Sequence, residues 1–427
     1  MIKTIQNGPL SGEIPAIASK SHAHRLLICA ALSDKPTRVR CTTTNADIDA
    51  TVSCLRSLGA DIQRKGEYFT VIPIRKESIE KGKTLDCGES GSTMRFLLPV
   101  VLALRADASL LGHGRLPSRP LSPLYEELTA HGAELSPMGT NPLRCGGSIS
   151  SGEYTIDGGV SSQFISGLMF ALPLLGEKSR ITVTGKAESR PYIDMTVSAL
   201  RQFGVEITET AENVFDIGVS SYVSPGDVYT EGDWSNAAFW LSAGAFSENG
   251  IRMTMLHPDS IQGDKRIVEI LSSFGAKVTC TDDAVSVKRT GTLHGVTIDA
   301  SDIPDLVPVV SVVAAGAVGT TIITGCGRLR LKESDRIASV CDMIRHLGGS
   351  VSADHDTITI NGTGSLTGGE VDSVNDHRIA MAAAVAAGIC TSPVTIAGAE
   401  AVAKSYPGFY EDLQSLEQEF EQKEDCV

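Results

Sequence analysis

The sequence predicts an α/β protein (α+β in its mixture of elements) made of about six repeated units in two domains. The chain has 427 residues, which exceeds the size at which one hydrophobic core keeps growing. One short sequence phrase also recurs along the chain at a nearly constant interval. The apolar share of 42% is that of an ordinary globular chain, so material for two cores is present.

The recurring phrase reads Leu-x-x-apolar-Gly-small-polar-apolar, with conservative replacements. Its five copies centre on Gly59, Gly132, Gly204, Gly275 and Gly348, which lie 73, 72, 71 and 73 residues apart. Each copy has the pattern of a last amphipathic helical turn, a glycine able to adopt the left-handed conformation, and the start of a strand. The phrase therefore predicts helix-to-strand corners in a repeated unit of about 72 residues.

A sixth corner would fall near the C-terminus, where the helical pattern of residues 409–420 has no strand pattern after it. The strand pattern of residues 2–6 is the candidate for the missing partner. The first and last segments are therefore expected to share a domain.

Residues 306–327 carry no charge and are numerous enough to cross a bilayer. Pro308 dilutes this apolar run, and Gly316 and Gly319 interrupt it. The segment is therefore predicted to be a buried helix followed by a Thr/Ile-rich strand.

The formal net charge of −14 disfavours nucleic acid and anionic membranes as partners, because both require a positive field. The first residues lack the apolar run of a signal peptide, so the expected location is the cytoplasm. The ten cysteines include no C-x-x-C pair. We therefore expect reduced, mostly buried thiols and no metal site.

Two segments of small or hydroxyl residues precede apolar helical stretches. In the first, Lys20, Ser21 and Arg25 combine cations and a hydroxyl with the unbonded N–H groups of a helix start, which suits phosphate or carboxylate binding. In the second, residues 88–95, Gly91 lets an anion approach the backbone closely. Taken alone, each segment also fits a capped helix start or a structural turn.

Further candidate anion-binding residues follow in the first half of the chain. Arg119 lies on a proline-stiffened loop, which suits a bidentate clamp. Ser161, Ser162 and Gln163 open another apolar helix, and Ser189 and Tyr192 follow about 28 residues later. Helix capping and a solvated loop are the alternative interpretations.

The second half places acids beside cations, as proton transfer next to an anionic substrate requires. These residues are Asp305, Lys332, Glu333, Arg336, His377, Arg378 and Lys404. Residues 331–336 also fit an exposed charged helix start, and His377 alone is more often structural than catalytic.

Together these segments resemble the enolpyruvyl transferase family, in the branch that uses shikimate 3-phosphate. The motifs SKSxxxR, GVSSQF, SRPYID, IPD, LKESDR and NDHR occur in the family's order over residues 18–408. The resemblance implies two domains of three repeated α/β units each: residues 1–19 with 231–427, and residues 20–230, with the active site in the cleft between them. It implies transfer of the enolpyruvyl group of phosphoenolpyruvate to the 5-hydroxyl of shikimate 3-phosphate, with release of phosphate. The expected enzyme is a monomer of aromatic amino acid biosynthesis that needs neither cofactor nor metal.

The same resemblance assigns residues to each substrate. Shikimate 3-phosphate would be held by Lys20, Ser21, Arg25, Ser161, Ser162, Gln163, Ser189, Tyr192, Asp305 and Lys332. Phosphoenolpyruvate would be held by Lys20, Gly91, Arg119, Gln163, Arg336, Arg378 and Lys404. Asp305 is the predicted base for the attacking hydroxyl and Glu333 the predicted donor to carbon, while Lys20 could serve in either role.

The sequence departs from many family members at two places. Residues 89–96 read Glu-Ser-Gly-Ser-Thr-Met-Arg-Phe in place of Asn-Ala-Gly-Thr-Ala-Met-Arg-Pro, which alters the pocket that the inhibitor glyphosate would share. Arg328 replaces an Asn that contacts shikimate in some members. Two alternatives remain: the branch that uses UDP-N-acetylglucosamine, whose reactive loop cysteine is missing from residues 112–120, and a non-catalytic anion-binding scaffold.

Overall fold

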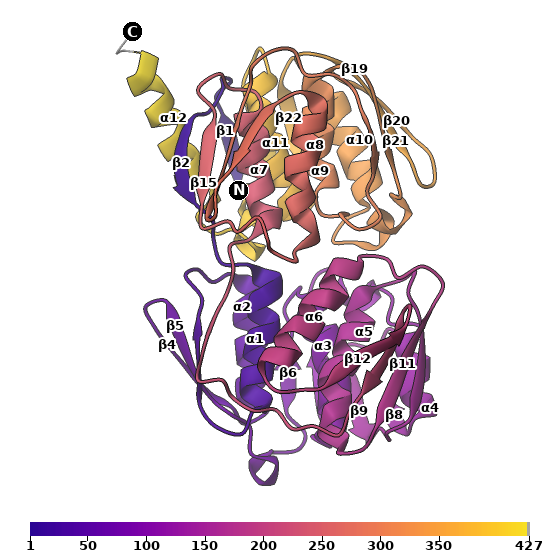
Figure 1. The fold of residues 1–427 in the computed structure, drawn as a ribbon. Helices are drawn as coiled ribbons and strands as arrows, with labels where there is room; N and C mark the ends of the chain where they lie inside the picture. Colours follow the sequence, from indigo (N-terminus) through magenta and orange to yellow (C-terminus); the bar gives the residue numbers. More distant parts are fainter. Residues whose placement is uncertain (425–427) are drawn as a thin grey trace. The chain divides into compact units, whose positions relative to one another are not determined.

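The computed structural model describes residues 1–424 and has a mixed α/β architecture, which confirms the predicted fold class. The chain forms two compact units: unit 1 contains Met1–Ile17 and the residues from Glu231 onward, and unit 2 contains Ala18–Thr230 (Figure 1). The chain therefore passes from one unit to the other twice.

Unit 2 contains three four-stranded sheets, ordered β14-β3-β5-β4, β6-β7-β9-β8 and β10-β11-β13-β12. Its helices are α1 (Lys20–Leu32), α2 (Ala46–Ser57), α3 (Gly91–Ala103), α4 (Leu124–Ala130), α5 (Ser162–Ala171) and α6 (Arg190–Gln202). Its strands are β3 (Thr37–Arg40), β4 (Asp61–Lys65), β5 (Tyr68–Ile72), β6 (Thr84–Asp86), β7 (Ala108–Leu111), β8 (Ala133–Leu135), β9 (Leu143–Gly147), β10 (Glu153–Asp157), β11 (Ser179–Thr184), β12 (Ile207–Ala211), β13 (Val214–Ile217) and β14 (Asp227–Tyr229).

Unit 1 contains the sheets β16-β17-β15-β2, β18-β19-β21-β20 and β1-β23-β22. Its helices are α7 (Trp234–Gly244), α8 (Ile267–Phe274), α9 (Val307–Gly316), α10 (Arg336–His346), α11 (His377–Ala386) and α12 (Phe409–Glu424). Its strands are β1 (Ile2–Ile5), β2 (Gly12–Pro15), β15 (Ile251–Thr254), β16 (Lys277–Cys280), β17 (Ala284–Lys288), β18 (Thr297–Asp299), β19 (Val318–Thr324), β20 (Ser350–Ala353), β21 (Ile358–Thr363), β22 (Gly369–Asp372) and β23 (Val394–Ala397).

The repeated corner is present at all five predicted positions. Each four-stranded sheet joins one parallel pair, such as β6 with β7, to an antiparallel hairpin, such as β9 with β8. The corner glycines have φ angles between +74° and +105°, in the left-handed region that side chains other than glycine rarely adopt. The five glycines are Gly59, Gly132, Gly204, Gly275 and Gly348. Their nearly constant spacing thus reflects one backbone requirement that recurs in five successive repeats.

The N-terminal strand belongs to the sixth sheet, as the repeat predicts. β1 pairs antiparallel with β23, with Ile2 opposite Ala397 and Ile5 opposite Val394. β23 in turn pairs with β22 in parallel, so this sheet has the parallel pair of the other repeats.

Apolar helices fill the interior of each unit. In unit 2, α3 and α5 pack side by side (Figure 1), and in unit 1, α7, α9 and α11 pack against one another. The uncharged residues 306–327 form α9 and β19, which confirms the predicted buried helix and strand. Within residues 1–424, no helix has both the length and the apolar composition needed to span a membrane.

Nine of the ten cysteines lie within the described residues, and all nine are free thiols. Eight of them are buried and Cys280 is exposed, as expected for reduced, mostly buried thiols. Cys426 lies outside the described residues.

Candidate functional site

Most candidate residues of unit 2 lie at the starts of its helices, whereas Arg25 lies in the second turn of α1 and Arg119 in the loop before α4. Ser19 caps α1, and its side chain accepts a hydrogen bond from the His22 N–H. Lys20 follows at the start of the helix, and its Nζ lies 2.9 Å from Asp47 Oδ2, with both side chains largely buried. Asp47 was not predicted, because nothing in the sequence shows that the start of α2 lies beside Lys20.

Arg25 joins the first turns of α1 and α6. Its guanidinium donates to the Ser21 carbonyl (2.6 Å), the Tyr192 carbonyl (2.8 Å) and Thr196 Oγ1 (2.8 Å). Burial lowers the pKa of Arg25 to about 10, so the side chain stays charged at neutral pH. The structure thus brings three predicted shikimate 3-phosphate ligands together, and Ser189 caps α6 next to them with φ +57°.

At the start of α3, the absence of a side chain at position 91 leaves room for the Arg119 guanidinium. Ser90 caps this helix by accepting from the Thr93 N–H (3.2 Å), and the Arg119 guanidinium lies directly over Gly91. A Cβ on residue 91 would lie 2.6 Å from Arg119 Nη1. Glycine therefore lets a cation approach the helix N-terminus closely, an arrangement that suits an anion.

Gln163 links the starts of α3 and α5. Its Nε2 donates to Ser92 Oγ (2.9 Å), and its Oε1 accepts from Arg95 Nη1 (2.8 Å). Ser161 caps α5 by accepting from the Gln163 N–H (3.3 Å), and Ser162 is the first helical residue.

Arg95 belongs to the segment of residues 88–95 but was not predicted as a site residue. Its side chain is buried, and its Nη2 donates to the Pro120 carbonyl (2.9 Å). Burial and the neighbouring Arg119 hold the pKa of Arg95 well below its usual range. Since its hydrogen-bond acceptors are neutral oxygens, this positive charge adds to the field at the start of α3.

In unit 1, two buried arginines converge on one carboxylate, and we call Asp305, Arg336, Asp376 and Arg378 the Asp305 cluster. Arg336 Nη1 donates to Asp305 Oδ1 (2.7 Å), and Arg378 Nη2 donates to Oδ2 (2.9 Å). The exposed fraction of the side chain is 19% for Asp305, 2% for Arg336 and 5% for Arg378. The carboxylate is therefore the most accessible member of this trio.

Asp376 holds Arg336 from the other side. Arg336 Nε donates to Asp376 Oδ2 (2.8 Å), and the same carboxylate caps α11 by accepting from the Arg378 N–H (3.0 Å). Ser334 Oγ also donates to Asp376 Oδ2 (3.0 Å). Asp376 belongs to the NDHR motif but was not predicted as a site residue, because its contact with Arg336 spans 40 residues of sequence.

Neighbouring opposite charges shift the pKa values of Asp305 and Arg336. Burial opposes ionisation of Asp305, but Arg378, Lys332 and Arg336 outweigh burial and hold its pKa well below the usual range. Burial lowers the pKa of Arg336, but Asp376, Asp305 and Glu333 outweigh burial and raise this pKa above the usual range. Asp305 and Arg336 are therefore ionised at neutral pH, and Arg336 likewise lowers the pKa of Asp376.

Glu333 lies beside the Asp305 cluster and contacts a histidine. His377 Nδ1 lies 2.8 Å from Glu333 Oε2, and the imidazole is buried. Ligand atoms of Glu333, Asp376 and His377 lie within 4.8 Å of one another, which is close enough for a metal ion. These carboxylates are, however, already engaged by the imidazole and by Arg336, and a guanidinium in this position disfavours a cation.

Lys404 and Arg328 complete the candidate residues of unit 1. Lys404 Nζ donates to the carbonyl of Asn375 (2.6 Å), two residues before His377. Arg328, for which no substrate contact was predicted, donates from Nη2 to the carbonyl of Ser301 (3.0 Å).

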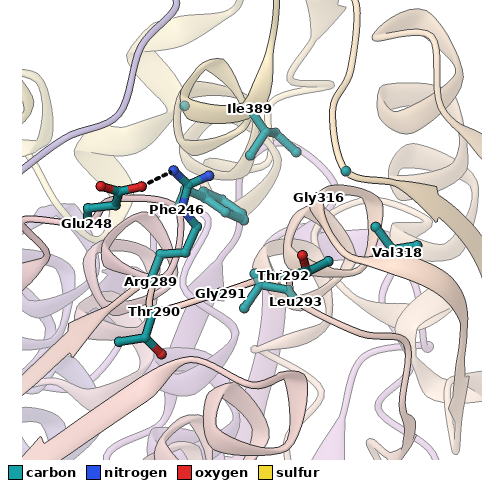
Figure 2. Close-up of a pocket in the computed structure, with 12 residues that line it drawn as sticks. Phe246, Glu248, Arg289, Thr290, Gly291, Thr292, Leu293, Gly316, Val318 and Ile389 are labelled. Carbon is teal, nitrogen blue, oxygen red and sulfur yellow. Dashed lines mark hydrogen bonds and ion pairs between the residues drawn. The ribbon is translucent and has the colours of Figure 1, made fainter.

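A separate cavity of about 810 Å³ lies at the C-terminal ends of three unit 1 helices, α7, α9 and α11 (Figure 2). It is lined by Phe246 beyond the end of α7, by Gly316 at the end of α9, and by Ile389 beyond α11. Its cation, Arg289, is paired with Glu248 at 3.0 Å (Figure 2). No predicted site residue lines this cavity, since those of unit 1 lie near the N-terminal ends of α9, α10 and α11.

The structure resembles solved structures of two transferases over nearly its whole length. For EPSP synthase from Acinetobacter baumannii, the TM-score is 0.80 at 26% identity, covering 97% of this chain and 98% of that chain. For the enolpyruvyl transferase NikO from Streptomyces tendae, the TM-score is 0.74 at 18% identity, covering 97% of each chain. The fold is therefore the two-domain fold of the enolpyruvyl transferases.

Sequence comparison narrows this class. The family model for EPSP synthase (3-phosphoshikimate 1-carboxyvinyltransferase) matches residues 5–413. Proteins named 3-phosphoshikimate 1-carboxyvinyltransferase are 40% identical over 418 residues in Clostridium botulinum (96% of each chain) and 42% identical over 411 residues in Clostridium acetobutylicum (95% of each chain). The chain belongs to the EPSP synthase family.

Proposed function

We propose that the chain is a 3-phosphoshikimate 1-carboxyvinyltransferase, which transfers the enolpyruvyl group of phosphoenolpyruvate to the 5-hydroxyl of shikimate 3-phosphate and releases phosphate. The observation that carries this function is the Asp305 cluster with Glu333 beside it. Two buried arginines supply an anion-binding surface, and two carboxylates supply the proton-transfer groups that addition and elimination require.

The proposed substrate ligands are divided between the two units. Gly91, Arg119 and Gln163 belong to unit 2, whereas Arg336, Arg378 and Lys404 belong to unit 1. Because all six are assigned to phosphoenolpyruvate, we propose that the active site forms in a cleft between a domain of residues 1–19 with 231–427 and a domain of residues 20–230. Most of the residues assigned to shikimate 3-phosphate belong to unit 2, where Arg25 bonds to the carbonyls of Ser21 and Tyr192. We further propose a cytoplasmic monomer.

The addition step of the proposed reaction needs two proton transfers, one to Asp305 and one from Glu333. Asp305 accepts the proton of the attacking hydroxyl as its oxygen bonds to C2 of phosphoenolpyruvate, and Glu333 donates a proton to C3. Glu333 then takes a proton back from C3 as the bond between C2 and the phosphate oxygen breaks. The proton on Asp305 leaves with the phosphate, and the product retains the enolpyruvyl double bond. Lys20 is the alternative group for either transfer.

Phosphate release tests the proposed function directly. We expect the protein to release phosphate from phosphoenolpyruvate with shikimate 3-phosphate, and not with UDP-N-acetylglucosamine. The Glu333→Gln variant should lower kcat by about 10²–10⁴-fold while binding of shikimate 3-phosphate in calorimetry stays near that of the wild type. Binding of both substrates without turnover would favour the anion-binding scaffold. Near-normal kcat in a folded Glu333→Gln variant would assign the proton donor to Lys20.

A further inference from the structure

We infer that the Asp305 carboxylate occupies a substrate anion's place on Arg336 and Arg378 in the unliganded protein, and that phosphoenolpyruvate must displace it before catalysis. This inference rests on the proposed function, because it assumes that the two arginines bind phosphoenolpyruvate. It adds an internal competitor for that substrate and a step that converts Asp305 from an ion-pair partner into a base.

The contacts of Asp305 are those that a bound anion would make. One arginine donates to each carboxylate oxygen, at 2.7 and 2.9 Å, and Arg378 Nη1 also reaches the Asp305 carbonyl at 3.2 Å. Charged hydrogen bonds of this length are the strong ones by which arginines recognise carboxylates and phosphates. An anion that binds the same guanidinium edges must therefore replace these bonds.

Arg336 is held on a second side, away from the Asp305 carboxylate. Arg336 is bound on its other side by Asp376 through Nε (2.8 Å) and Nη2 (3.3 Å). Asp376 is itself bound by the helix start that it caps and by Ser334. Asp305 lies in the turn two residues before α9 and is the most exposed of the trio. An incoming anion is therefore expected to move Asp305 rather than Arg336.

Displacement changes the chemistry of Asp305. With the arginines paired to it, the pKa of Asp305 lies well below the usual range, so the carboxylate is a weak base. Once an anion takes over the guanidinium groups, part of this stabilisation is lost and a negative charge lies nearby, and both changes raise the pKa. The Asp305 carboxylate would then become an effective base only when phosphoenolpyruvate is bound.

Removal of the carboxylate separates competition from catalysis. Asp305→Asn and Asp305→Ala should bind phosphoenolpyruvate roughly 10- to 100-fold more tightly than the wild type without shikimate 3-phosphate, because no charged side chain competes for the arginines. Inorganic phosphate should show the same direction in titration calorimetry. Asp342→Asn removes the same charge from the exposed face of α10 and should leave both affinities unchanged.

Thermal unfolding supplies a second measurement, because removal of Asp305 takes away the carboxylate that the two buried arginines share. Phosphoenolpyruvate or phosphate should therefore raise the Tm of the Asp305 variants more than that of the wild type. Unchanged or weaker affinity in these variants, or no added protection by either anion, would overturn the inference. If the wild type still releases phosphate normally, such a result overturns only the inference about Asp305 and leaves the proposed function intact. No turnover by the wild type would instead refute that function.

Discussion

Asp264 places a further buried carboxyl group next to the Asp305 cluster. It lies in the turn before α8, where the Ser235 hydroxyl donates to its Oδ2, and its Oδ1 is buried with no hydrogen-bond partner within the described residues. Burial raises the pKa of Asp264 to about 7, with Asp305 and Asp233 adding to the rise and Arg378 and the Ser235 bond opposing it. This carboxyl group is therefore partly protonated at neutral pH, unlike Asp305.

The pH dependence of stability tests this raised pKa. Between about pH 4 and pH 7, folded Asp264 keeps a proton that the unfolded chain loses, so its contribution to the free energy of unfolding falls as pH rises. Asp264→Asn removes this dependence. The variant should gain stability relative to the wild type from pH 4 to pH 7, by a few kcal/mol at most since one pKa unit corresponds to about 1.4 kcal/mol. Denaturant unfolding at pH 4, 6 and 8 measures the gain, and the exposed Asp342→Asn variant should show none. A gain that is the same at every pH would contradict the shift.

Individual residues of the site could be predicted where a motif carries them. Arg336, Glu333 and Arg378 lie in short charged motifs, and the structure places them together. Asp47 and Asp264 had no such signal, because each acquires its partner only when segments about 30 residues apart meet. The low pKa of Asp305 was also beyond reach of the sequence, since it depends on which arginines face the carboxylate.

Two corner glycines offer a matched test of the repeated element. Gly59 and Gly132 both have φ +105°, so alanine would suffer the same backbone strain at either position. A Cβ at Gly132 would lie 2.7 Å from the Ser148 carbonyl oxygen, whereas the nearest atom to one at Gly59 lies 3.9 Å away. Gly59→Ala should therefore cost about 1–2 kcal/mol from strain alone, and Gly132→Ala should cost distinctly more. Urea unfolding compares the two, and equal losses would show that the carbonyl contact carries no weight.

Elements could be predicted where one physical requirement repeats. The five corners were identified because each needs a left-handed glycine, and the segment at 306–327 because its charge-free run is interrupted at Gly316 and Gly319. The start of β1 was expected from its strand pattern, but its register against β23 was not. That register depends on residues separated by nearly the whole chain, and a local sequence pattern contains no information about such distant pairs.

Substrate binding should change the whole molecule. Because proposed ligands belong to both units, shikimate 3-phosphate and phosphoenolpyruvate together are expected to draw the units toward each other. Solution X-ray scattering should show a smaller radius of gyration with both substrates than without. The Asp342→Asn variant should compact like the wild type. An unchanged radius under saturating substrates would contradict closure and, with it, an active site shared between the units.

The pairing of β1 with β23 has a consequence for synthesis on the ribosome. Unit 2 is one continuous stretch, Ala18–Thr230, and can complete its core while later residues are still being translated. β1 is synthesised before unit 2, yet its neighbour β23 is synthesised nearly 400 residues after β1. At about 5–20 residues per second, this delay lasts roughly 20–80 s. During that interval β1 lacks its partner strand, so it stays available to chaperones that bind extended segments for longer than the strands of unit 2 do.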